Sequence, residues 1–220
     1  MNINNLNLTD DRSRLIRKQL KLYLVTDRPL SLGRELDWIV TEAVRGGTTM
    51  VQLREKEADT RDFVALGLKL KELLTPLGVP LIINDRIDVA LAVDADGVHI
   101  GQSDMPYDIA RHLLGPDKII GLSAECMDDV LAANRLDVDY VAVSPVYGTP
   151  TKTDTSAPFG LDGLRRAVEL TRHPSVAIGG MNERTAPGVF ATGVDGIAVV
   201  SAICSAPDPC EAARRLANIK

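Results

Sequence analysis

The sequence predicts an α/β fold, a single (β/α)₈ barrel with a short N-terminal helical extension. Short runs rich in Ile, Val and Leu alternate with segments that carry apolar residues at helical spacing. Eight such strand–helix units fit within the 220 residues, and 45% hydrophobic content is ample for one core. Two small domains and an open doubly wound sheet are the alternatives, but an open sheet rarely needs eight regular units.

The chain divides into an N-terminal extension, residues 1–20, and the barrel, residues 21–220. The extension is polar, and Thr9, Asp10 and Asp11 are suited to cap a short helix through residues 14–16. We assign no chemistry to this segment.

Strands and helices alternate through the rest of the chain. The predicted strands cover residues 22–26, 49–54, 81–85, a run beginning at 97, 118–123, 140–144, 175–179 and 196–200. The predicted helices cover residues 35–44, 60–74, 86–93, a run opening at Pro106, 128–134, 164–170, 183–190 and 209–217. A long connection rich in Pro, Gly and Thr spans residues 145–160, and such loops are usually functional or disordered.

The active site of a (β/α)₈ barrel lies at the carboxyl ends of its strands. These ends carry cations, two acids and amide-rich turns, in chain order Gln52, Arg54 and Lys56; Asn84 and Asp85; Asp104; Ser123; Thr149, Thr151 and Lys152; Gly179 and Gly180; Val200 and Ser201.

Two acids follow neighbouring strands, and they indicate a metal clamp. Asp85 and Asp104 should emerge together at one edge. With Arg54, Lys56 and Lys152 they suit a diphosphate bound as its Mg²⁺ salt, since Mg²⁺ takes one or two carboxylates plus phosphate oxygens. The alternative is a set of solvated ion pairs at the rim.

The last two strand ends favour phosphate binding. Gly179-Gly180 and Val200-Ser201 stand where barrels commonly hold phosphate, through backbone N–H groups at the start of a short helix. The alternative for the two glycines is that they merely permit a tight turn.

The sequence offers no obvious nucleophile. His99 lies within a strand and reads as a satisfied strand-face residue, while His112 and His173 lie on or after helices. Ser123 and Ser201 have no histidine nearby in the sequence and no nucleophile-elbow glycines. We therefore expect electrostatic catalysis, in which a carbon group moves from diphosphate to a second, phosphorylated substrate.

Composition excludes several other classes of function. A net charge of −5 and a pI near 5.3, with scattered Lys and Arg, give no electrostatic footprint for nucleic acid. Three cysteines without C-x-x-C spacing predict ordinary thiols in a reducing compartment. No signal peptide or membrane span is evident, so we expect a soluble cytoplasmic protein. Its expected partners are small phosphorylated molecules, and the sequence is compatible with a homo-oligomer without indicating one.

The motifs at these strand ends, taken together, resemble those of the thiamine-phosphate synthase family. They run in order over about residues 22–203: Val51-Gln-Leu-Arg-Glu-Lys56, Ile83-Asn-Asp-Arg86, Gly97-Val-His-Ile-Gly-Gln-Ser-Asp104, Gly121-Leu-Ser123, Ser144-Pro-Val-Tyr-Gly-Thr-Pro-Thr-Lys152, Pro158-Phe-Gly-Leu161, Val176-Ala-Ile-Gly-Gly180 and Gly196-Ile-Ala-Val-Val-Ser201. Each motif is weak alone, but the set is specific.

The resemblance implies a condensation of 4-amino-2-methyl-5-hydroxymethylpyrimidine diphosphate with a thiazole phosphate, or its carboxylated tautomer, to thiamine phosphate and diphosphate. It places Mg²⁺ on Asp85 and Asp104. By the same resemblance, the pyrimidine diphosphate would be bound by Gln52, Arg54, Lys56, Asn84, Ser123 and Lys152. Of these, Arg54, Lys56, Ser123 and Lys152 would be the catalytic residues. The thiazole phosphate would be bound by Thr149, Thr151, Gly180, Val200 and Ser201.

The chain departs from the family pattern at two places. Glu125 stands where a histidine often follows the strand serine, and the related thiazole tautomerase uses a histidine there. Glu125, the intact Asn84-Asp85 pair and the 149–152 motif favour the synthase. Ser144 stands where glycine is common. A barrel that binds phosphorylated thiazole or thiamine without turnover is the other alternative, but it would not need the two acids and three cations.

Overall fold

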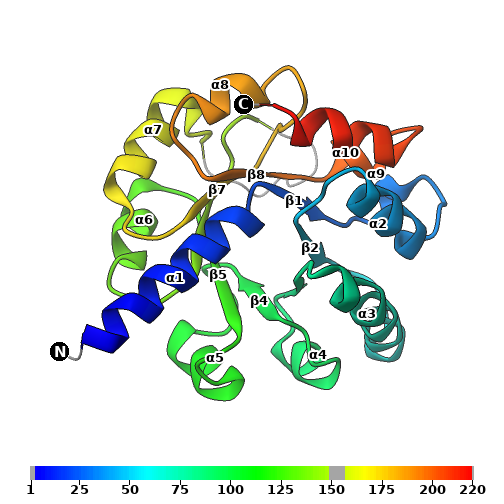
Figure 1. The fold of residues 1–220 in the computed structure, drawn as a ribbon, viewed down its shortest axis with the longest axis horizontal. Coiled ribbons are helices and arrows are strands. Elements are labelled where there is room, and N and C mark those ends of the chain that lie inside the picture. The colour runs from blue at the N-terminus through cyan, green and yellow to red at the C-terminus, as the bar shows by residue number, and fades with distance from the viewer. Residues whose placement is uncertain (1–2, 149–156, 220) are drawn as a thin grey trace.

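A closed barrel of parallel strands forms the centre of the molecule, as the sequence predicts (Figure 1). The computed structural model describes residues 3–148 and 157–219. Within these residues the strands pair in sequence order and β8 closes onto β1. They are β1 (Leu22–Val25), β2 (Met50–Leu53), β3 (Leu81–Asn84), β4 (Gly97–Ile100), β5 (Ile119–Ala124), β6 (Tyr140–Val143), β7 (Ser175–Ala177) and β8 (Gly196–Val199).

Helices surround the barrel and connect its strands (Figure 1). They are α1 (Ile3–Gln19), α2 (Leu36–Arg45), α3 (Thr60–Leu74), α4 (Ile87–Ala92), α5 (Tyr107–Leu114), α6 (Met127–Ala133), α7 (Gly160–Leu170), α8 (Ala186–Phe190), α9 (Ser201–Cys204) and α10 (Pro209–Ala217), with 3₁₀ turns η1 (Pro29–Ser31) and η2 (Thr75–Leu77). No helix in the described part of the chain has the length and apolar character needed to cross a bilayer.

Alternation along each strand divides the buried residues into two cores. Leu22 and Leu24 of β1 face the surrounding helices, whereas Tyr23 and Val25 face the barrel interior. The interior core is small and mixed, and it comprises Ile16, Leu20, Tyr23, Val25, Met50, Ile82, Ile119, Tyr140, Ala142, Val176 and Ala198. Side chains therefore fill the barrel interior near the beginnings of the strands, and a cavity is left near the ends of the strands.

Helix α1 is longer than the predicted short helix, and it crosses one end of the barrel (Figure 1). Ile16 and Leu20 are 3% and 0% exposed and belong to the interior core. Gly196 makes this approach possible, because a Cβ there would lie 1.8 Å from the Leu20 carbonyl oxygen. The helix thus closes the end of the barrel at which the strands begin.

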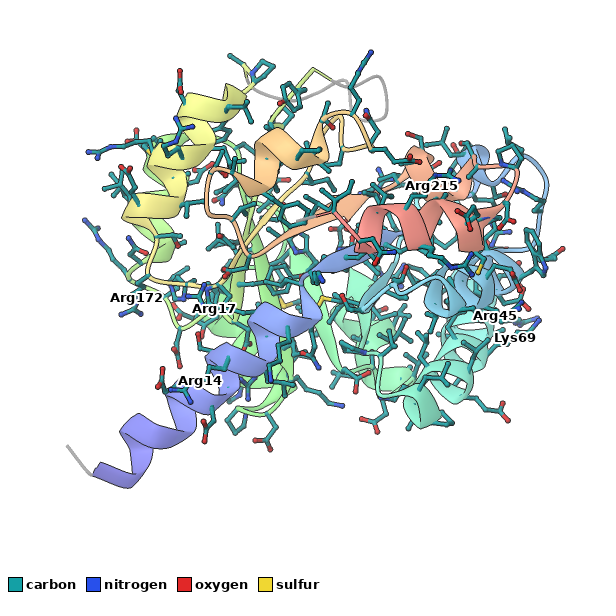
Figure 2. The ribbon with its side chains drawn as sticks, turned by 45° about the horizontal axis from the view of Figure 1, so that its top comes forward. Arg14, Arg17, Arg45, Lys69, Arg172 and Arg215 are labelled. Carbon is teal, nitrogen blue, oxygen red and sulfur yellow. The ribbon has the colours of Figure 1, made fainter. Side chains whose placement is uncertain are left out.

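Two ion pairs attach α1 to strand beginnings. Arg12 Nε lies 2.5 Å from Asp139 Oδ1, and Arg17 Nη1 lies 2.5 Å from Asp195 Oδ2; Figure 2 shows Arg17 on this helix. Asp139 also accepts the Ile120 backbone N–H at 2.8 Å. These carboxylates join the helix to the sheet, so residues 10–20 pack on the barrel; their assignment as a separate unit stays a prediction.

Candidate active site

A cavity of about 740 Å³ opens at the carboxyl ends of the strands. Its lining includes the predicted site residues that the structure describes, which are Gln52, Arg54, Lys56, Asn84, Asp85, Asp104, Ser123, Gly179, Gly180, Val200 and Ser201. The size lies within the range of small-molecule sites. Thr149, Thr151 and Lys152 lie outside the described residues.

Arg54 is held in place by two residues of the segment that follows β1. Its Nη1 lies 2.9 Å from Asp27 Oδ2, and its backbone N–H donates to Thr26 Oγ1 at 3.0 Å. Asp27 is 8% exposed, and its other oxygen accepts the Leu30 N–H. The pair is sheltered, so it fixes the guanidinium at the cavity wall. The sequence patterns did not indicate Asp27.

The two predicted metal acids lie together on the same wall. Lys56 Nζ contacts Asp85 Oδ2 at 2.7 Å, and the Gly101 N–H donates to Asp104 Oδ2 at 2.6 Å. Burial raises the pKa of Asp104 above its usual value, and the neighbouring Asp85 carboxyl raises it further. Asp85 has a φ of 60°, a left-handed conformation that non-glycine residues seldom adopt. The backbone is thus strained where the carboxylate enters the cavity.

The donor set fits Mg²⁺ better than a metal that needs a full protein cage. No group of three or more His, Cys, Asp or Glu side chains in the described ranges could hold a metal ion. Mg²⁺ commonly takes only one or two carboxylates and completes its shell with water and phosphate oxygens. Asp85 and Asp104 repel each other when both are ionised, and a bound cation would reduce this repulsion.

The glycine pair forms a tight turn at the opposite wall of the cavity, and its role in phosphate binding stays a prediction. Gly179 and Gly180 have φ values of 101° and 72°, so the turn itself requires glycine. A Cβ at Gly179 would lie 2.8 Å from Pro145 Cβ, which shows how closely the loop after β6 approaches. Beside this turn, the short helix α9 begins at Ser201, and only Val200 separates it from β8.

The cavity floor holds polar residues that the sequence did not assign to the site. Tyr23 and His99 line the cavity, and Tyr23 accepts a hydrogen bond from Gln52 Nε2 at 2.7 Å. His99 Nε2 lies 2.9 Å from Ser123 Oγ. The expectation that Ser123 has no histidine nearby holds along the sequence but not in space, because the adjacent strands β4 and β5 place the two side chains together.

Comparison with known proteins agrees with this geometry. The family model for thiamine monophosphate synthase matches residues 22–203. The thiamine-phosphate synthase of Albidiferax ferrireducens is 56% identical over 200 residues, covering 91% of each chain. The chain belongs to the thiamine monophosphate synthase family.

Two further relatives extend this similarity to a solved structure. The thiamine-phosphate synthase of Vibrio parahaemolyticus is 53% identical over 90% of this chain and 97% of its own. The thiamine phosphate pyrophosphorylase of Pyrococcus furiosus is 41% identical, with a TM-score of 0.85 over 93% of this chain and 96% of its own. As a member of the thiamine monophosphate synthase family, the chain is a transferase of thiamine biosynthesis.

Proposed function

We propose that the protein condenses 4-amino-2-methyl-5-hydroxymethylpyrimidine diphosphate with a thiazole phosphate, or its carboxylated tautomer, to give thiamine phosphate and diphosphate. One observation carries the proposal. A single cavity has two cations and two carboxylates on one wall and a glycine turn with a helix start on another. The first wall suits a diphosphate and the second a monophosphate.

The diphosphate would lie against Arg54 and Lys56. Arg54 is already oriented by Asp27, so little side-chain entropy remains to be lost when the ligand binds. Asn84 and Ser123 supply neutral polar contacts beside it. We carry Lys152 over from the family resemblance as a third cation for the diphosphate.

Asp85 and Asp104 would hold Mg²⁺. When bound, the ion would neutralise negative charge on the departing diphosphate. Asp85 contacts Lys56 in the present structure, so the lysine would pass from this carboxylate to the diphosphate when the metal binds Asp85.

The thiazole phosphate would lie against Gly180, Val200 and Ser201. Positive φ at Gly179 and Gly180 turns the backbone after β7. Thr149 and Thr151 join this set from the family resemblance. A substrate held by its phosphate would place its ring nitrogen toward the pyrimidine, because both substrates share one cavity.

The proposed reaction is dissociative. The carbon–oxygen bond to the diphosphate breaks first and its electron pair leaves with the diphosphate, whose charge Arg54, Lys56 and Lys152 stabilise. The aminopyrimidine delocalises the positive charge left on its methylene carbon. The thiazole nitrogen then forms the carbon–nitrogen bond with its lone pair, so positioning replaces an enzymic nucleophile.

Asp85→Asn tests the metal assignment, because asparagine also tolerates a positive φ and the change removes mainly the charge. We expect turnover to fall at least roughly a hundredfold, since a charge-stabilising group is lost. Thiazole phosphate binding, measured by calorimetry, should stay within about twofold, less than the loss of one hydrogen bond would cause.

The matched control is Asp88→Asn, which removes an exposed carboxylate paired with Arg86 on α4. This control should behave as wild type in both measurements. Turnover in Asp85→Asn equal to that of the control would refute the role of Asp85.

A further inference from the structure

A chain of hydrogen bonds crosses the barrel interior beneath the cavity. Tyr23 Oη accepts from Gln52 Nε2 at 2.7 Å and lies 2.8 Å from Tyr140 Oη. Tyr140 Oη lies 3.0 Å from His99 Nδ1, and His99 Nε2 lies 2.9 Å from Ser123 Oγ. The chain therefore links two residues proposed to bind the pyrimidine diphosphate, Gln52 and Ser123.

The packing of the strands is adapted to this chain. Gly121 pairs in register with His99 on one side and with Tyr140 on the other. A Cβ at Gly121 would lie 2.0 Å from Tyr140 Cζ, so only glycine leaves space for the phenol. The rings of His99 and Tyr140 then stack with centroids 5.5 Å apart and planes inclined by 22°.

Both tyrosines stay protonated across the range in which the protein would work. Tyr23 and Tyr140 are 1% and 0% exposed, and burial raises the pKa of each phenol well above its usual value. A neutral phenol has one proton to donate and can also accept. Each tyrosine has two partners in the chain, so each donates to one and accepts from the other.

Gln52 fixes the direction of the chain. Since its Nε2 donates to Tyr23, the Tyr23 proton is directed to Tyr140 Oη, and the Tyr140 proton to His99 Nδ1. A neutral His99 then carries its ring proton on Nε2 and donates to Ser123 Oγ. The hydroxyl proton of Ser123 remains for an acceptor in the cavity.

We propose that Tyr23 and Tyr140 are positioning residues that fix the ring proton of His99 on Nε2 and so make Ser123 a hydrogen-bond donor toward the pyrimidine diphosphate. The inference rests on the proposed function, because it takes that molecule as the ligand of Ser123. Its structural part, the tautomer of His99, is independent of turnover.

The direct test is ¹⁵N NMR of the histidine rings in the wild-type protein, in mildly alkaline buffer where imidazole is neutral. The chain has three histidines, and the His99 signals are those missing from His99→Asn. We expect the proton on Nε2 of His99. A proton on Nδ1 would overturn the proposal, because the hydrogen bonds of His99 with Tyr140 and with Ser123 would then both be reversed. This measurement needs no folded Tyr140 variant and no activity.

Tyr140→Phe removes the oxygen and keeps the ring. We expect its His99 to lose the fixed Nε2–H tautomer. The KM for the pyrimidine diphosphate should rise roughly tenfold, as for one lost hydrogen bond, while the KM for the thiazole phosphate stays unchanged. Tyr23→Phe should weaken the same tautomer preference, because Tyr140 then loses the hydroxyl donor that directs its own proton to His99 Nδ1.

Tyr107→Phe is the matched control, since its hydroxyl donates to the Asp137 carbonyl away from the cavity. It should match wild type in both readouts. A wild-type tautomer and an unchanged KM in a folded Tyr140→Phe would overturn the positioning role. A wild type that shows the Nε2–H tautomer but forms no thiamine phosphate would instead refute the proposed function.

Discussion

The cations Arg54 and Lys56 at the cavity each form an ion pair with a carboxylate. The partner determines whether the cation is already oriented for its ligand. Arg54 is held by Asp27, which is itself anchored by the Leu30 N–H. Lys56 instead contacts Asp85, an acid proposed to bind metal. We infer that Arg54 is preorganised for the diphosphate, whereas Lys56 exchanges one anionic partner for another.

Asp27→Asn tests this preorganisation. Without the carboxylate, Arg54 gains rotamer freedom that binding must again restrict, so we expect the KM for the pyrimidine diphosphate to rise roughly tenfold. Steady-state kinetics with each substrate varied in turn checks this, and the KM for the thiazole phosphate should not change. Arg165→Gln, which removes an exposed ion pair with Asp162 on α7, is the control. Equal changes in both KM values would point to a general structural defect.

At this scale the sequence predicted the residues that meet the cavity but not those that hold them. Arg54 and Asp85 directly follow strands and Ser123 lies one residue before the end of β5, so their position follows from strand order alone. Asp27 and Tyr140 act through contacts between different strands, which depend on side-chain packing. Thr149, Thr151 and Lys152 lie outside the described residues, and their roles stay predictions.

Individual strands and helices are placed by contacts at both of their ends. His173 precedes β7 and is 7% exposed, with its Nε2 3.0 Å from the Ala133 carbonyl oxygen at the end of α6. Burial lowers the pKa of His173, and the neighbouring Arg172 lowers it further. The folded protein therefore binds a proton at this histidine less readily than the unfolded chain does.

A pH dependence of stability follows from His173. The unfolded chain binds a proton below the ordinary pKa of about 6.5, whereas the folded protein resists protonation. Stability from this residue is thus complete above about pH 6.5 and is lost as the pH falls from there toward the lower folded pKa. His173→Gln should show a smaller loss of unfolding free energy on acidification, measured by urea denaturation.

The control for this experiment is His112→Gln, since His112 is exposed on α5. It should lose stability with acid as the wild type does. If His173→Gln also follows the wild-type curve, burial of His173 does not contribute to acid sensitivity.

The succession of strands and helices was predictable because hydrophobic periodicity is local. The extent of α1 was not, because its own sequence is polar and its apolar contacts are made through Ile16 and Leu20 to the distant barrel interior. The role of Gly121 was equally hidden. Its lack of a side chain matters only because Tyr140 of the next strand occupies that space.

The two ends of the barrel serve different purposes. Where the strands begin, α1 seals the interior and Asp139 and Asp195 join it to the sheet. Where the strands end, the cavity collects charged and polar side chains, one strained backbone position and the buried hydrogen-bond chain beneath them. This division is the general one for such barrels, with stability at one face and chemistry at the other.

The most direct test of the whole account is product formation by the purified protein. The pyrimidine diphosphate and the thiazole phosphate are supplied together, either with Mg²⁺ or with excess chelator, and thiamine phosphate and diphosphate are both quantified. We predict that the two products appear in equal amounts and only with Mg²⁺. Absence of product from folded protein that still binds the thiazole phosphate, or equal product in chelator, would contradict the account.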